Sequence, residues 1–456
     1  MKNYKILSTL FAGLLVLSSC EDFLNLAPIS EIGSNGFYTN NEQIEAGVFA
    51  IYDGMQNMVQ TEYAVTEMRS DNSKTRTSEG EWAQFESMNV DPANSTVSVY
   101  WSSNYNIIFR ANIVLENLGA VTIPAKKSQF EGEAKFARAW SHFNLVRAFG
   151  DVPLINRVIS PSSPSDNDFF GRTDKAEVMA SIISDLKDAA AMLPVRAGIG
   201  EGRATAGAAN ALLGKVYLTT GDYAAAKIAL DAVSTTEYSL MATYNDVFYK
   251  ELNKEIIFAV QFIKDNATDS EFFSLEFTSK GRATGLNFAT NDLMAAVDAT
   301  DKRKSTLFYL EPAVGRWECG KYLSSSTNSS LSGNDWIVLR YADVLLMQVE
   351  AIMAGGTSTS NATAVAAFNL IRTRAGMPVV TSVSKDDLVK ERRIEFAFEN
   401  QRLYDLVRFG VADAVMGAFS LKGEPDFIYS STALLLPVPQ REINLYDKLK
   451  QNPGYN

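Results

Sequence analysis

The sequence contains very little cysteine and histidine. Among its 456 residues there are two cysteines, Cys20 and Cys319, and one histidine, His142. A single histidine excludes multi-histidine metal sites and disfavours a serine or cysteine catalytic triad. Because His142 lies in the regular helical pattern of residues 139–143, we expect it to have a structural role.

The start of the chain has the pattern of a bacterial lipoprotein signal. Lys2 and Lys5 precede an apolar stretch, residues 6–17, that is much shorter than the roughly 20 residues of a membrane-spanning helix. The stretch ends in Leu-Ser-Ser followed by Cys20, which resembles a lipobox. This resemblance implies that residues 1–19 are a signal peptide and that Cys20 becomes the lipidated first residue of the mature protein. The alternative is a plain signal peptide followed by an incidental cysteine.

Lipidation of Cys20 would leave Cys319 without a disulfide partner, so the mature fold would depend on its hydrophobic core. Hydrophobic residues make up 46% of the chain, which makes a large core feasible. Without the two lysines of the signal, 40 basic and 53 acidic residues remain, a formal net charge of −13. Nucleic-acid binding needs a basic face, so no nucleic-acid partner is expected.

Helical periodicity dominates the regular parts of the sequence. Residues 131–149 carry large apolar side chains at three- and four-residue steps and end before Gly150, which predicts an amphipathic helix. A second helix is predicted from the N-cap Asp174 to Leu193. A third, residues 100–118, places Trp101 on an apolar stripe, where we expect a core residue.

Two segments indicate pairs of antiparallel helices. In residues 209–233, the positions of Gly214, Tyr217 and Ala226 match the tetratricopeptide repeat, in which small residues let two helices approach closely. A similar pair is predicted for residues 341–353 and 362–374, joined by a turn rich in glycine, serine and threonine.

Two long polar stretches interrupt the helices and contain aromatic residues. They span residues 60–98 and 265–335, and irregular segments of this length in a compact domain are usually functional. No linker separates two domains. We therefore predict one domain over residues 20–456, with a tetratricopeptide-containing part at about 20–265 and a second part at about 266–456.

Three motifs in the second part resemble one known family. They are residues 336–351, beginning Trp-Ile-Val-Leu-Arg-Tyr, the charged segment 391–408, and the tail formed by residues 436–443 and 451–455. Together with the lipobox they resemble the SusD/RagB family of Bacteroidetes surface lipoproteins. The resemblance implies a mainly α, SusD-like fold with tetratricopeptide-like helix pairs, long irregular loops and minor β-structure. It also implies capture of a glycan, at the outer membrane of the cell surface, for a SusC-like TonB-dependent transporter.

The charged segment 391–408 is read as one helix. Glu391, Glu395 and Glu399 lie at four-residue spacing and would repel each other, whereas Arg392 with Glu395 and Glu399 with Arg402 are opposite pairs. The repulsion between the three glutamates can be compensated if the arginines also bind buried partners. We therefore predict a structural ion network and not a catalytic carboxylate pair. Trp336 and Arg340 are likewise expected to brace the fold.

A sugar site needs exposed aromatic rings for stacking and polar side chains for the hydroxyl groups. Both polar stretches contain such a cluster. The candidate ligand-binding residues are Trp82, Phe85, Arg76 and Asp71 in the first stretch, and Trp317, Arg316, Lys321 and Tyr322 in the second. Each tryptophan could equally be a core residue.

Several alternatives to glycan capture remain open at this stage. A RagB-like protein could capture peptides, and a glycoside hydrolase needs only two well-placed carboxylates among the 53 acidic residues. A scaffold for protein partners would fit the helical repeats but would leave the lipid anchor unexplained. No catalytic constellation is recognisable, so we expect a protein without enzymatic activity, metal or cofactor.

Overall fold

The computed structural model describes residues 37–75, 80–159, 169–278, 287–312, 315–422 and 429–455. The predicted signal peptide, Cys20 and Arg76 lie outside these residues. None of the helices in the described ranges is long and apolar enough to cross a membrane.

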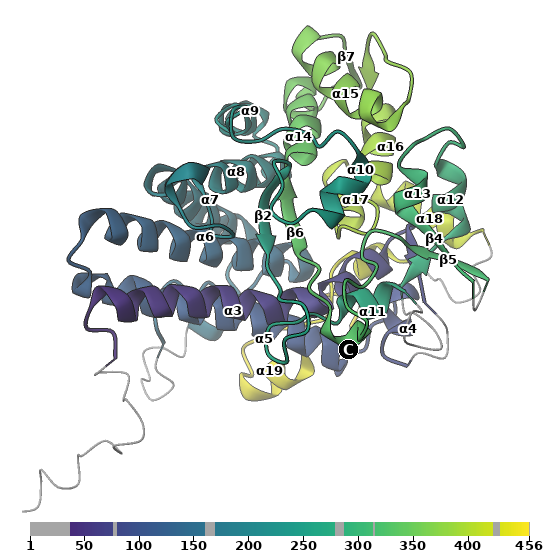
Figure 1. Cartoon of the computed structure of the whole chain (residues 1–456). Helices are drawn as coiled ribbons and strands as arrows, with labels where there is room; N and C mark the ends of the chain where they lie inside the picture. Colours follow the sequence, from purple (N-terminus) through teal and green to yellow (C-terminus); the bar gives the residue numbers. More distant parts are fainter. Residues whose placement is uncertain are drawn as a thin grey trace, which may run out of the picture.

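Six helices of the first half of the chain form an array in which each packs against the next, and α14 from the second half packs onto its end. Figure 1 shows α6, α7 and α8 stacked beside α3 and α5, with α9 and α14 continuing the array. Its members are α3 (Asn41–Val65), α5 (Ser95–Asn117), α6 (Pro124–Phe149), α7 (Lys175–Met192), α8 (Ala206–Thr220), α9 (Tyr223–Asp231) and α14 (Tyr341–Met353).

The predicted helices are confirmed, and their caps explain where they begin and end. The side chain of Asp174 accepts a hydrogen bond from the amide of Ala176 at the start of α7, and α6 ends at Gly150, whose φ is +76°. Helix α5 begins five residues before the predicted start, because Asn94 caps it by accepting from the amides of Thr96 and Val97.

The predicted tetratricopeptide-like pair is formed by α8 and α9. Gly221 ends α8 in the left-handed conformation with φ +79°, and Asp222 caps α9. A methyl group at Gly214 would lie 2.5 Å from Leu230 Cγ, so the two helices touch where the sequence has a glycine. The second predicted pair is α14 with α15 (Ala362–Ala375).

The strands form four short antiparallel ladders of two strands each within the described residues. The pairs are β1 (Ser73–Lys74) with β3 (Phe288–Ala289), β2 (Ile256–Val260) with β6 (Trp336–Arg340), β4 (Phe308–Glu311) with β5 (Arg316–Cys319), and β7 (Ser358–Thr359) with β8 (Val383–Ser384). The fold is therefore mainly α with minor β-structure, as the resemblance implied.

Within the motif at residues 336–351, residues 336–340 form strand β6, and the helix begins at Tyr341, as predicted for the second helix pair. The prediction for the charged segment is wrong. The segment 391–408 is not one helix: α16 (Lys385–Glu395) ends before a turn, and α17 (Arg402–Arg408) follows it. In that turn Phe398 and Asn400 have positive φ angles, and their amides donate to the buried carboxylate of Glu67. This long-range contact outweighs the local helical pattern.

The stretches predicted to be irregular contain short elements. Residues 60–65 belong to α3 and residues 95–98 to α5. Between them and in the second stretch lie two short 3-10 helices, the strands β1 and β3–β5, and the helices α4 (Ala83–Glu86), α11 (Phe273–Phe277), α12 (Asn291–Ala296) and α13 (Lys304–Leu307). Elsewhere the chain forms α10 (Tyr244–Tyr249), α18 (Ala412–Ser420) and α19 (Gln440–Leu445). Figure 1 shows α12, α13 and the β4–β5 hairpin on the side of the molecule opposite α6 and α7.

One large apolar cluster holds both parts of the chain together. It runs from Ile44 in α3 through Phe258 in β2 and Trp336 in β6 to Leu449 near the end of the described residues. Trp101 is buried in this cluster, as predicted. His142 is also buried, with Nδ1 3.1 Å from the carbonyl oxygen of Arg138, and burial lowers its pKa to about 3. Its role is therefore structural.

Candidate functional site

Two candidate residues of the first polar stretch lie inside the protein. Arg402 donates from Nε and Nη2 to the two carboxylate oxygens of Asp71, at 2.7 and 2.9 Å. Burial alone would raise the pKa of Asp71, but Arg393 and Arg402 outweigh it and keep the pKa below its usual value. Phe85 is fully buried in the main apolar cluster. Both side chains are therefore buried, and the Asp71 carboxylate is already bonded to Arg402.

Lys321 and Tyr322 of the second stretch are also buried. The Lys321 ammonium group lies 2.5 Å from a Glu399 carboxylate oxygen and 3.2 Å from the carbonyl oxygen of Glu395. The ring of Tyr322 packs at 5.2 Å from that of Trp336. The chain turns into the core directly after β5, so both residues lie away from the surface.

Trp82 is half-buried. Its ring stacks on Tyr63 with the centroids 5.7 Å apart and the planes 9° from parallel. One face of the indole is therefore occupied by the protein itself, which limits the surface that Trp82 can offer to a sugar.

Trp317 is the candidate with the most exposed ring. It lies on β5 opposite Leu310 on β4, and 45% of Trp317 and 44% of Leu310 are exposed. The ring borders a hollow of about 600 Å³. The other residues that line it come from α12, from the loop that leads to α13, from the first turn of α13 and from the start of β4: Met294, Ala299, Thr300, Asp301, Lys302, Lys304, Ser305 and Phe308.

The wall opposite Trp317 is fixed by a buried ion pair. Asp301 is buried and accepts from Arg303 Nε at 3.0 Å and from Arg303 Nη2 at 2.7 Å. The guanidinium of Arg303 also reaches Glu391 at 2.6 Å and Glu395 at 2.9 Å in α16. The loop that carries Lys302 and Lys304 is therefore tied to the core on both sides of Lys302.

This ion pair is the edge of a larger buried network. Arg340 donates to Glu399 at 2.7 Å, to Glu395 at 2.6 Å and to Glu255 at 2.9 Å. Burial alone would raise the pKa of Glu395, but Arg374, Arg340 and Arg303 outweigh it and hold the pKa well below its usual value. The predicted structural ion network is confirmed.

The local charge pairs predicted along 391–408 are not the ones that form. Arg392 pairs with Asp343 and Asp405, each at 2.8 Å, and Arg402 pairs with Asp71. The break between α16 and α17 separates Glu399 from Arg402, whereas Arg392 and Glu395 both remain in α16 but bond to residues of other elements. Each arginine therefore finds a carboxylate on another element or beyond the break.

The structure brings the two polar stretches together. Strand β1 pairs with β3 through Lys74 and Phe288, and the Arg316 guanidinium lies over the Phe288 ring at 4.2 Å. Arg316 also donates to the carboxylate of Glu318 at 2.7 Å. Arg316 is next to Trp317 in the sequence, but its positive charge is paired with the carboxylate of Glu318 on the same strand.

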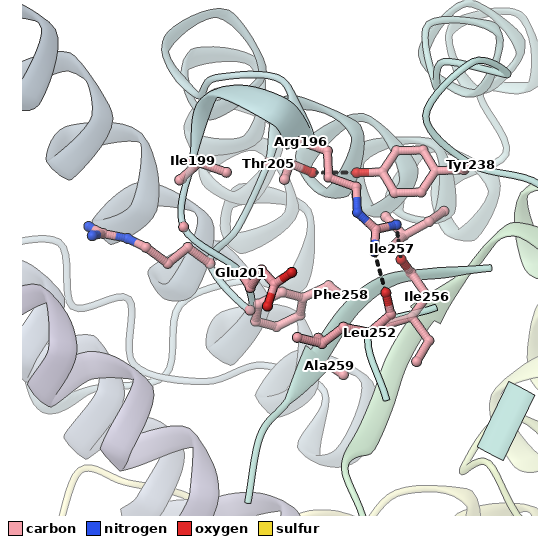
Figure 2. A pocket seen from close by; sticks show the side chains of 13 residues that line it. Arg196, Ile199, Glu201, Thr205, Tyr238, Leu252, Ile256, Ile257, Phe258 and Ala259 are labelled. Atoms are coloured by element: carbon pink, nitrogen blue, oxygen red, sulfur yellow. Dashed lines mark hydrogen bonds between the residues drawn. The ribbon is translucent and has the colours of Figure 1, made fainter. Parts of the chain in front are cut away.

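A second hollow of about 210 Å³ lies between residues 196–205 and strand β2 (Figure 2). Three of its polar side chains are already bonded: Arg196 donates to the carbonyl oxygen of Leu252 at 2.6 Å, and the hydroxyl groups of Tyr238 and Thr205 are 2.8 Å apart. The Tyr238 ring is buried. Because this hollow offers no exposed ring, the Trp317 hollow is the better candidate for a carbohydrate.

The eight other residues that line the hollow, among them Met294, Lys302, Lys304 and Phe308, were not singled out from the sequence. All of them lie in the stretch 265–335 that its aromatic and polar composition marked as functional. Composition indicated the correct stretch, but only the tertiary structure separates the side chains that line the hollow from those in the core.

Comparisons with known proteins agree with these observations. The model of the SusD family matches residues 287–455, and a family model described as starch-binding and associating with the outer membrane matches residues 22–218. A SusD-like protein of Formosa agariphila is 27% identical over the full length of both chains.

Solved structures share the fold. That of a laminarin-binding SusD-like protein is 27% identical and covers 92% of this chain and 100% of its own, with a TM-score of 0.78. Surface glycan-binding protein A from Bacteroides thetaiotaomicron, in complex with laminarihexaose, is 21% identical with a TM-score of 0.77, and it covers 91% of this chain and 100% of its own. Family models match both parts of the sequence and the fold aligns over nearly its whole length, so the chain belongs to the SusD/RagB family.

Proposed function

We propose that this protein is a cell-surface lipoprotein that captures an oligo- or polysaccharide and delivers it to a SusC-like TonB-dependent transporter in the outer membrane. The observation that carries the proposal is the exposed ring of Trp317 at the wall of a hollow of about 600 Å³. A sugar ring can stack on the indole while its hydroxyl groups meet the polar loop opposite. The outer-membrane description of the family and the glycan-binding relatives support this reading.

Attachment to the membrane would be through Cys20 after removal of residues 1–19. The apolar stretch before Cys20 is too short to span the bilayer, whereas a lipidated cysteine would hold the protein at the surface. The protein would then be tethered beside its transporter, with the hollow free to meet polysaccharide.

The hollow is suited to binding and lacks the groups for hydrolysis. Glycoside hydrolysis needs two carboxyl groups placed on either side of the scissile bond. Among the described residues that line the hollow, Asp301 is the one carboxylate, and it is buried and bonded to Arg303 on both oxygens. A general acid must carry or release a proton at the substrate, which this paired group is not placed to do.

The proposal is tested by Trp317→Ala, with Phe109→Ala as the matched control. The two aromatic residues are equally exposed, at 45%, but Phe109 lies on α5, away from the hollow. One stacked ring contributes about 0.5–1.5 kcal/mol beyond its buried area, so Trp317→Ala should weaken binding to the cognate glycan at least several-fold, by calorimetry. Phe109→Ala should bind as the wild type does.

Three further readouts separate the alternatives. The ligand should be recovered chemically unchanged, and an affinity-tagged protein should co-purify with a TonB-dependent barrel. Steady cleavage of a polysaccharide by the purified protein would overturn the proposal in favour of a hydrolase. Retention of peptides, and of no glycan, would favour the RagB-like alternative. Normal binding by Trp317→Ala would transfer the site to Trp82.

A further inference from the structure

We propose that the Trp317 hollow selects a glycan that carries acidic groups, either carboxylates or sulfate esters. This inference rests on the proposed function, because it specifies the ligand of the same site. It is carried by the charges of the polar loop that shares the hollow with the indole ring: among the described lining residues the exposed charged side chains are the cations Lys302 and Lys304.

Lys302 and Lys304 supply the positive charge of this loop. Both side chains are exposed and line the hollow, and within the described part of the chain neither ammonium group forms an ion pair. The nearest exposed acid on the same loop is Asp298, whose carboxylate accepts from the amide and the hydroxyl group of Thr300 at 2.8 and 2.7 Å. The hydrogen bonds from Thr300 are the main cause that lowers the pKa of Asp298, and the positive charges of Lys390 and Lys304 lower it further. The cations around the hollow therefore outnumber this acid.

The wall contains no carboxylate that could accept hydrogen bonds from a neutral sugar. Asp301 is the acid among the described lining residues, and Arg303 occupies both of its oxygens. Neutral sugars are usually held by a mixture of acceptors and donors, because each hydroxyl group can act as both. Two free ammonium groups without a free carboxylate instead suit an acceptor-rich ligand such as a uronate or a sulfate ester.

The position of Lys302 is constrained by its packing. The Lys302 stem lies over Gly376 at the end of α15, where an added methyl group would be 2.9 Å from Lys302 Cε. The Lys302 amide also donates to the carbonyl oxygen of Ala375 at 2.9 Å. The charge is thus held on a fixed side of the hollow, which reduces the side-chain entropy lost when an anion binds.

The rest of the protein does not provide a general attraction for anions. The mature chain has a formal net charge of −13, so its overall field repels a polyanion. A third hollow, beside Phe49, has the opposite character, because its lining includes the acids Asp53, Glu201 and Asp269. Preference for an acidic glycan would therefore be a local property of the Trp317 hollow.

The test uses polysaccharides that differ only in charge. Polygalacturonate is compared with its carboxyl-reduced form, and a sulfated galactan with its desulfated form, by calorimetry at low and at high salt. At low salt the wild type should bind the charged member of at least one pair roughly three- to ten-fold more tightly, as expected for two exposed charge contacts. The preference should shrink in about 1 M salt, where the screening length is about 3 Å.

Variants assign the preference to the hollow. Lys302→Gln with Lys304→Gln should abolish the preference for the charged member and leave binding of the neutral member unchanged. Lys187→Gln is the control, because Lys187 is an exposed lysine on α7, on the opposite side of the molecule (Figure 1). It should leave the preference intact.

The outcomes distinguish this inference from the proposed function. Equal or tighter binding of the neutral members, lost in Trp317→Ala, would overturn the inference while the proposed function stands. A charge preference that survives the double lysine variant would also overturn it, because another surface would then be responsible. Failure of the wild type to bind any of the four polysaccharides would overturn the inference and count against glycan capture itself.

Discussion

Gly214 offers the sharpest test of how the α8–α9 pair is held together. An added methyl group at Gly214 would lie 2.5 Å from Leu230 Cγ and 2.6 Å from Leu230 Cδ2, whereas carbon atoms in ordinary contact are about 3.5–4.0 Å apart. Leu230 is fully buried, so its side chain has little room to move. Gly214→Ala should therefore force the two helices apart by roughly 1 Å at this point.

The expected cost follows from two opposing effects. Replacing glycine by alanine inside a helix stabilises it by about 0.8–1 kcal/mol, whereas overpacking a core costs typically about 1–3 kcal/mol. We therefore expect Gly214→Ala to lower the free energy of unfolding by about 0–2 kcal/mol, and the branched Gly214→Val to lower it further. Urea denaturation followed by far-ultraviolet circular dichroism measures both changes.

Gly417 supplies the matched control. It lies inside α18, and the nearest atom to an added methyl group, Tyr429 Cδ1, is 3.9 Å away. Gly417→Ala should therefore stabilise the protein by up to about 1 kcal/mol. In a Leu230→Ala background, which removes the contact, Gly214→Ala should no longer be destabilising. Two results would contradict this explanation. Gly214→Ala could stabilise the protein as Gly417→Ala does, or it could lower the free energy of unfolding by the same amount in the wild type and in Leu230→Ala. Either result would show that the close packing of α8 on α9 is not the reason why this position needs glycine.

Two further predictions concern the anchor and the buried charges. Cys20→Ala should release the protein from washed membranes, and a variant that stays in the membrane fraction would contradict lipidation. Arg340→Met should lower the free energy of unfolding by about 3–5 kcal/mol, because it leaves the buried Glu395 and Glu399 short of a partner. Arg110→Met, which breaks a solvent-exposed ion pair, should cost less than about 1 kcal/mol in the same urea titration, and equal losses would refute the role of burial.

Helix positions were readable from the sequence where local chemistry decides them. Asp174 and Gly150 cap helices in the structure as their residue types indicated, and Gly214 lies at a close helix contact as the repeat spacing indicated. Local patterns were misleading where a distant group competes with them. The carboxylate of Glu67 binds two amides of the turn after α16, more than 300 residues further along the chain, and this contact ends a helix that the charge pattern would have continued.

The sequence predicted which stretch contains the candidate site but not which of its residues line the hollow. The exposure of each side chain depends on partners that lie far along the chain. Trp317 and Lys321 are four residues apart and similar in their surroundings of glycine, tyrosine and charge. Trp317 is left at the surface of the β4–β5 hairpin, whereas Lys321 is drawn into the core by Glu399, 78 residues away. A charged lysine is generally buried only where a carboxylate lies within ion-pair distance, since an unpaired buried charge costs several kcal/mol. The same rule explains why Lys302 and Lys304, which have no such partner among the described residues, remain at the surface, where they can meet a ligand.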